Sequence, residues 1–140
     1  MKKRKIAIID KDTKAIDGLK EILSSCGYAP VPVIDSLLAV NTIIQSNLDL
    51  ILMDLRMPRQ REFEITYTIN RLCETKKVPI IAMSESCKDD FRGLLDFRGI
   101  KTWIKKPFQP LNLIWAIENE IEEGSGFVTE NRLAGMGIVS

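Results

Sequence analysis

Histidine is absent from this sequence, and cysteine is scarce. The 140 residues contain no histidine and only three cysteines, Cys26, Cys73 and Cys87, which are far apart and form no CxxC pair. The missing histidine excludes a histidine general base and a serine–histidine–aspartate triad. The cysteine spacing argues against a zinc site or a disulfide scaffold, so we expect three reduced thiols in a cytoplasmic protein.

Long apolar runs and an excess of one charge are also missing. After the basic start MKKRK, only the four apolar residues 6–9 precede Asp10, too few for a signal peptide, and no stretch is long enough to span a membrane. Twenty Lys and Arg oppose 19 Asp and Glu, which leaves a formal net charge of +1. This balance gives no reason to expect a direct nucleic-acid or membrane partner for this segment.

Short apolar runs alternate with helical patterns along most of the chain. Strands are expected at 5–9, within 28–34, at 48–54 and 78–84, and within 101–108. Helices are expected from 13 to about 26, over 35–46, over about 62–74, over 88–97 and over 109–123. Five strands alternating with five helices predict an α/β fold, a doubly wound parallel sheet with helices on both faces.

Two prolines set the expected strand order. Pro30 and Pro32 cannot donate to a strand ladder, so the second strand should lie at a sheet edge. The order is then 2-1-3-4-5, which is flavodoxin-like, with a binding crevice at the carboxyl ends of the strands. We assign residues 1–123 to this domain. Residues 124–140, with four of the eight glycines, are expected to be a flexible linker or tail leading to an output domain beyond this segment.

Polar residues follow the expected strands at this edge. Asp10, Lys11 and Asp12 follow the first strand, Asp54 ends the third, Ser84 ends the fourth, and Lys105 and Lys106 end the fifth. Singly, such residues are usually helix caps or surface groups, and Asp12 or Thr13 is placed to cap the first helix. Together they suit a nucleophilic carboxylate that accepts a phosphoryl group. That chemistry needs a divalent cation, a hydroxyl donor and a fixed ammonium.

The segments DLILMDLRMP, VPIIAMS, and KKPF after GIKTWI resemble the receiver domain of two-component response regulators, over about Lys5 to Glu123. The resemblance implies that Asp54 is the phosphoacceptor and that Ser84 is the switch hydroxyl. It also implies that Lys106 contacts the phosphoryl group, and that Trp103 is the aromatic residue whose rotamer reports activation. Core packing is an almost equal alternative for Trp103. Mg²⁺ is the implied cofactor; its ligands would be Asp10, Asp54 and the backbone carbonyl of Arg56, with Asp12 as a further candidate.

Four positions depart from the family pattern. Lys11 stands where the family has a second acid that binds magnesium directly, and Glu85 follows the switch hydroxyl where a small residue is usual. Arg61 and Glu62 stand where the family often has Asp-Gly. Lys11 near Asp54 would weaken the metal site and replace part of its charge; the alternative is a Lys11 side chain that points to solvent. Glu85 would either gate entry to Asp54 or repel an incoming phosphoryl donor.

Three functions therefore compete. The first is a receiver that accepts phosphate on Asp54 from a histidine kinase or phosphotransfer protein. It would switch the face formed by the helix at 88–97, the fifth strand and the last helix, and would have at most autophosphatase activity. That face would serve an output domain or a homodimer. The second is a degenerate receiver that binds partners without phosphorylation. The third is a haloacid-dehalogenase-like phosphatase with Asp10 as nucleophile and Asp12 as acid/base, which leaves Asp54 unexplained.

Overall fold

The structure is a computed structural model that describes residues 2–54, 60–85, 100–123 and 138–139. Its six strands are β1 (Lys5–Ile9), β2 (Ala29–Val33), β3 (Leu50–Asp54), β4 (Ile80–Ser84), β5 (Ile100–Lys105) and β6 (Ile138–Val139). The helices within these residues are α1 (Thr13–Ser25), α2 (Ser36–Gln45), α3 (Gln60–Lys76) and α4 (Pro110–Glu123).

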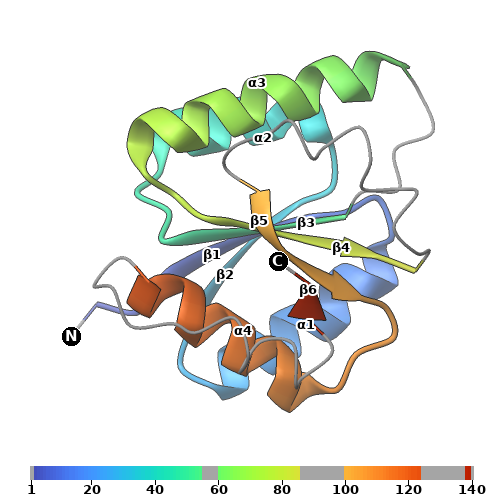
Figure 1. Ribbon diagram of the computed structural model, residues 1–140, viewed down its shortest axis with the longest axis vertical. Coiled ribbons are helices and arrows are strands. Elements are labelled where there is room, and N and C mark those ends of the chain that lie inside the picture. The colour runs from blue at the N-terminus through green and yellow to red at the C-terminus, as the bar shows by residue number, and fades with distance from the viewer. Residues whose placement is uncertain (1, 55–59, 86–99, 124–137, 140) are drawn as a thin grey trace.

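All six strands form one sheet in the order β2-β1-β3-β4-β5-β6 (Figure 1). The first five strands pair in parallel, which confirms the predicted order 2-1-3-4-5. The described residues contain four helices instead of the predicted five, because the helix expected over 88–97 lies outside them. Strand β6, which pairs antiparallel with β5, was not predicted. The rest of the expected tail, residues 124–137 and 140, is outside the described part.

The proline-bearing strand β2 lies at one edge of the sheet, as predicted. The N–H of Ala29 donates to the carbonyl of Arg4 at 2.8 Å, so Ala29 faces β1. Because backbone groups alternate along a strand, Pro30 and Pro32 fall where the backbone nitrogen faces away from β1. No ladder hydrogen bond is lost there, which explains why β2 tolerates both prolines.

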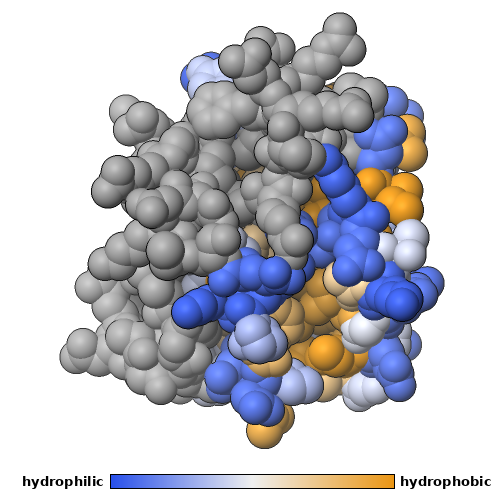
Figure 2. Space-filling view, turned by 90° about the vertical axis from the view of Figure 1, so that its right-hand side faces the viewer, coloured by the Kyte–Doolittle hydropathy of each residue, from blue (hydrophilic) through white to orange (hydrophobic). Residues whose placement is uncertain are grey.

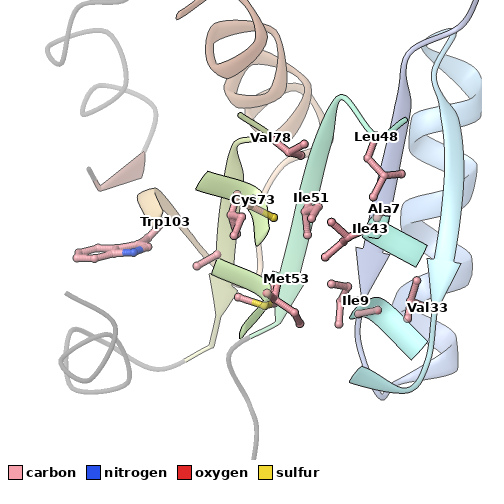
Figure 3. Close-up of a cluster of buried hydrophobic side chains, with 14 residues drawn as sticks. Ala7, Ile9, Val33, Ile43, Leu48, Ile51, Met53, Cys73, Val78 and Trp103 are labelled. Atoms are coloured by element: carbon pink, nitrogen blue, oxygen red, sulfur yellow. The ribbon is translucent and has the colours of Figure 1, made fainter. Parts of the chain in front are cut away.

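Helices cover both faces of the sheet. In Figure 1, α2 and α3 lie above it, and α1 and α4 lie below. Alternate residues of each strand serve the two layers: Ala7 and Ile9 belong to the cluster beside α2 and α3 (Figure 3), and Ile6 and Ile8 to the cluster beside α1 and α4. Strand β3 is buried along its whole length, as expected of a central parallel strand.

The two helices of the upper layer are joined by Lys76, the last residue of α3. Its ammonium donates to the carbonyls of Ile43 and Ile44 in the last turn of α2, at 2.6 and 2.9 Å. A cation at a helix C-terminus complements the partial negative charge of the unpaired carbonyls. This contact fixes the end of α2 against α3. Among the described helices, none is long and apolar enough to cross a membrane.

Candidate phosphoacceptor site

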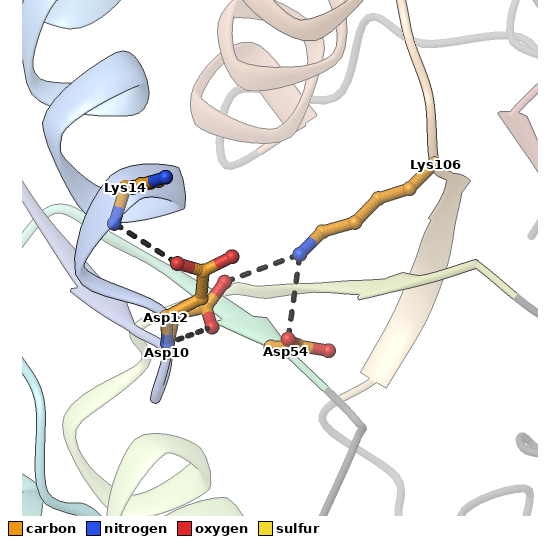
Figure 4. A network of polar contacts seen from close by, with 5 residues as sticks. All are labelled: Asp10, Asp12, Lys14, Asp54 and Lys106. Atoms are coloured by element: carbon orange, nitrogen blue, oxygen red, sulfur yellow. Dashed lines mark hydrogen bonds and ion pairs between the residues drawn. The ribbon is translucent and has the colours of Figure 1, made fainter.

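Four predicted site residues lie at the carboxyl ends of adjacent strands. Asp10 follows β1, Asp54 ends β3, Ser84 ends β4, and Lys106 follows β5. Because the sheet is parallel, these chain positions meet at one edge, and Figure 4 shows Lys106 reaching from the end of β5 toward both aspartates. Figure 2 views the molecule from the side toward which β4 runs. There, hydrophilic described residues flank a smaller hydrophobic area.

Lys106 joins the two aspartates. Its ammonium Nζ lies 3.1 Å from Asp10 Oδ2 and 3.3 Å from Asp54 Oδ2. The exposed side-chain fraction is 15% for Lys106, 1% for Asp10 and 12% for Asp54. The three charges are therefore held largely out of water, while Asp54 keeps a small opening to solvent. The Lys106–Asp10 pair spans 96 positions of the chain, and the sequence analysis did not predict it.

The other oxygen of Asp10 is held by the backbone. Asp10 Oδ1 accepts the N–H of Asp12 at 2.9 Å, so both carboxylate oxygens of Asp10 have partners. Asp12 is the N-cap of α1; Asp12 and Thr13 were the two candidates expected from the sequence. Asp12 Oδ1 accepts the N–H of Lys14 at 2.9 Å. This capping role occupies one oxygen of the carboxylate that was a further candidate metal ligand.

Burial raises the pKa of Asp10 above its ordinary value, because desolvation disfavours the charged carboxylate. The hydrogen bond from the Asp12 N–H acts in the opposite direction, and the nearby charge of Asp54 raises the pKa further. The charge of Lys106 and its hydrogen bond lower the pKa, but do not cancel the effect of burial. The ammonium of Lys106 therefore favours the ionised form of Asp10 and opposes the effect of burial on its pKa.

Ser84 and Trp103 belong to β4 and β5, the two strands that meet beside Lys106. Ser84 is fully buried, and its backbone carbonyl accepts the N–H of Lys106 at 2.7 Å, which fixes the end of β5 against β4. In the β3–β4 register Asp54 stands opposite Met83, the neighbour of Ser84. Trp103 is 8% exposed and belongs to the cluster in Figure 3, so its core-packing role is real; its role as a reporter of activation stays a prediction.

The departures from the family pattern lie at the rim. Lys11 and Glu85 are both exposed, directly after Asp10 and Ser84 respectively. The predicted approach of Lys11 to Asp54 and the predicted repulsion by Glu85 stay predictions. Arg56, whose carbonyl was a predicted metal ligand, lies outside the described residues, as do the side chains of Arg61 and Glu62.

The donor atoms of the site fit a hard cation in part. Asp10 and Asp54 supply carboxylate oxygens, which magnesium prefers, and magnesium commonly takes only one or two carboxylates and completes its shell with water. Within the part of the chain that the structure describes, no group of three or more histidine, cysteine, aspartate or glutamate residues could hold a metal ion. The family's second adjacent acid, which Lys11 replaces, would have been the additional carboxylate.

Known proteins resemble this chain in sequence. The family model for the response regulator receiver domain matches residues 6–118. Response regulator GtcR of Aneurinibacillus migulanus is 30% identical over 122 residues, which are 87% of this chain and 49% of that protein. The phosphate regulon transcriptional regulatory protein PhoB of Klebsiella pneumoniae is 24% identical over 139 residues, 96% of this chain and 59% of that protein. The chain thus spans about half the length of these relatives.

Solved structures agree on the fold. The receiver domain of sensor histidine kinase PA1611 from Pseudomonas aeruginosa PAO1 superposes with a TM-score of 0.73, covering 86% of this chain and 98% of that one. The identity is 24%, so the likeness shows a shared fold. That structure is described as having a magnesium ion coordinated in its active-site cleft.

Proposed function

The chain belongs to the response regulator receiver domain family, and from this premise we propose that Asp54 accepts a phosphoryl group from a histidine kinase or phosphotransfer protein. The observation that supports the proposal is the contact of Lys106 with both Asp10 and Asp54 at the strand ends. It places an ammonium beside a carboxylate that is partly open to solvent. Such a group can neutralise charge that develops on a transferring phosphoryl group.

The reaction we propose is a phosphoryl transfer in two bond changes. One carboxylate oxygen of Asp54 attacks phosphorus and forms an acyl phosphate, while the P–N bond to the donor histidine breaks and its imidazole leaves with the bonding electron pair. With acetyl phosphate as the donor, a P–O bond breaks and acetate leaves. Asp54 attacks as a carboxylate, and the Lys106 ammonium lies 3.3 Å from its Oδ2.

The charge of the site explains why a cation is needed. Asp10, Asp54 and Lys106 leave one net negative charge when all are ionised. A phosphoryl group on Asp54 adds further negative charge and oxygens that accept hydrogen bonds. Lys106 would turn toward one phosphoryl oxygen, and the buried hydroxyl of Ser84 would donate to another.

Magnesium is the proposed cofactor, with Asp10, Asp54 and the Arg56 carbonyl as its proposed ligands; the carboxylates of Asp10 and Asp54 supply part of this donor set. When bound, it would supply charge neutralisation for the phosphoryl oxygens. We propose that Lys11 weakens its binding, because an ammonium replaces a carboxylate beside Asp10. An ammonium beside the metal site would repel a divalent cation because like charges repel. The exposure of Lys11 weakens this repulsion through solvent screening.

The signal would be transmitted through β5, the strand that directly precedes Lys106. Movement of Lys106 and Ser84 on phosphorylation would be passed along β5 to Trp103, and from there to the surface formed by β5, α4 and the helix expected over 88–97. An output domain is the proposed partner, in a cytoplasmic setting. The length of the curated relatives, about twice that of this chain, supports a further module.

One observation favours the second candidate function, a receiver that binds partners without phosphorylation. Both carboxylates already have Lys106 as a counter-ion, and Lys11 stands at the position of the missing acid. An internal ammonium that offsets part of the negative charge of the two carboxylates reduces the need for a metal. No described contact favours the phosphatase alternative, because the Asp12 carboxylate that would act as its acid/base caps α1.

Intact-mass spectrometry after incubation with acetyl phosphate tests the proposal. Wild type, Asp54→Asn and Lys11→Asp would each be incubated with and without magnesium, with Asp49→Asn as a matched control at a distant aspartate. We expect one phosphoryl adduct on wild type and on the Asp49 control, and none on Asp54→Asn. Lys11→Asp should reach the same adduct yield at a lower magnesium concentration.

Three results would overturn parts of this proposal. An adduct on Lys11→Asp but none on wild type at any magnesium concentration would establish the degenerate receiver. An adduct that survives Asp54→Asn would remove Asp54 from the acceptor role. Turnover of a generic phosphatase substrate that survives Asp54→Asn but not Asp10→Asn would support the phosphatase alternative.

A further inference from the structure

The outer edge of β5 pairs with the C-terminal residues of the same chain. Strand β6 runs antiparallel to β5, with Val139 opposite Trp103 and Ile138 opposite Ile104. Figure 1 shows β6 beside β5, near the C-terminus. An open edge strand presents unpaired N–H and C=O groups that attract another strand. Because an edge pairs with one strand at a time, β6 excludes any other strand from these residues.

The covered residues directly precede the functional lysine. Trp103 and Ile104 are followed by Lys105 and by Lys106, whose ammonium contacts Asp10 and Asp54. Their side chains serve opposite layers of the core, Trp103 on the α2–α3 side and Ile104 on the α1–α4 side. The backbone of this segment is thus anchored on both faces of the sheet, and its outer edge is the part that β6 covers.

The chain is long enough to make this contact within one molecule. Fourteen residues, 124–137, separate the end of α4 from β6. At roughly 3.3 Å per residue they can reach about 46 Å, more than twice the roughly 20 Å length of a six-residue strand. Because β5 and β6 belong to one chain, their pairing can occur within one molecule and does not require a second molecule in solution.

A strand of two residues is also short enough to detach from β5. Short edge strands are one of the devices by which proteins protect a sheet edge, and pairing over two residues is far below the usual strand length of about five or six. We propose that Ile138–Val139 form a removable autoinhibitory cover on the β5 edge, held in the same chain. Its release exposes β5 to antiparallel pairing with a second copy. The pairing of β6 with β5 does not depend on the proposed function. Only a role of the uncovered β5 edge in signalling rests on it.

Hydrogen–deuterium exchange on the full chain tests the cover. The variant Ile138→Pro/Val139→Pro removes both N–H donors of β6, and Ile138→Val/Val139→Ile is the matched control that keeps them. In the proline variant the β5 amides that face β6 should lose their protection, so peptides over residues 100–105 should exchange faster than in wild type. They should be unchanged in the control. Peptides from β1 and β3 should exchange equally in all three proteins, which separates loss of the cover from misfolding.

Light scattering on the same samples tests the exposed edge. The proline variant should form dimers at concentrations where wild type and the control are monomeric.

Equal exchange in all three proteins would overturn the cover. Protection in wild type that rises with protein concentration, together with a dimer mass, would show exchange of β6 between copies and overturn pairing within one chain. Faster exchange in a monomeric proline variant would overturn the self-pairing of the edge. No phosphoryl donor is present, so failure of the Asp54 proposal would leave these results unaffected.

Discussion

Replacing Lys106 with methionine should cost the protein about 3 kcal/mol of folding free energy at neutral pH. The ammonium lies 3.1 Å from Asp10 and 3.3 Å from Asp54. At an effective dielectric constant of 20, each contact corresponds to about 5 kcal/mol of raw attraction. Desolvation of the ammonium offsets much of this, and breaking a buried ion pair by removing one partner costs about 3–5 kcal/mol in practice. We take the lower end because Lys106 is still 15% exposed and Asp10 can take up a proton.

The loss should depend on pH. Burial already raises the pKa of Asp10, and without the ammonium that pKa rises further. A carboxyl with a higher pKa in the folded protein than in the unfolded chain binds more protons when folded. Its stabilising contribution is therefore present below the unfolded value of about 3.9 and is lost as the pH rises through the folded value. The deficit of Lys106→Met should be larger near pH 8 than near pH 5.

Urea unfolding of a double-mutant cycle measures the prediction. Asp10→Asn keeps an oxygen that can accept the Asp12 N–H and removes the charge that Lys106 neutralises. We expect Lys106→Met/Asp10→Asn to be more stable than Lys106→Met at pH 8, with a coupling free energy of at least about 1 kcal/mol. Lys105→Met, at the exposed neighbouring position, is the matched control and should change stability by less than about 0.5 kcal/mol. A Lys106→Met variant as stable as this control would refute the reasoning.

Three smaller predictions follow from the described contacts. Asp12→Ala should cost about 1 kcal/mol in urea unfolding through loss of the α1 cap, Asp12→Asn should cost less, and a full cost for Asn would contradict capping. Lys76→Met should cost about 0.5–1 kcal/mol through loss of its contacts with α2, and Lys77→Met should be nearly neutral. Burial raises the pKa of Cys73 to about 12, so peptide mapping after iodoacetamide treatment near pH 8 should find Cys73 unlabelled in the folded protein and the exposed Cys26 labelled. Equal labelling would contradict the burial of Cys73.

The fold was predictable because its determinants are local. Pro30 and Pro32 place β2 at the edge through a missing donor, which a single sequence shows directly. The continuous apolar run that ends at Asp54 identifies a central strand, and the parallel order then brings Asp10, Asp54 and Ser84 to one edge. The strand order and the family were therefore accessible from the sequence.

The contacts that decide the electrostatics were not accessible in the same way. The pairing of Lys106 with Asp10 joins residues 96 positions apart and depends on the exit of the chain from β5. The sequence placed Lys106 at the site as the contact of the phosphoryl group, but it did not show that Lys106 pairs with Asp10. The approach of Lys11 to Asp54 stays a prediction. Strand β6 was missed because two apolar residues in a glycine-rich segment carry no periodicity. The contact of Lys76 with α2 likewise depends on the packing of two helices.

The central claim is that the carboxylate of Asp54, beside Lys106, receives the phosphoryl group. Borohydride reduction after incubation with acetyl phosphate and magnesium tests it most directly, because the reagent converts an aspartyl phosphate to homoserine, which peptide mass spectrometry then locates. The account predicts homoserine at residue 54 of wild type, little in Lys106→Met, and none at Asp10 or Asp12. Homoserine at residue 10 or 12, or at no aspartate under any magnesium concentration, would contradict it.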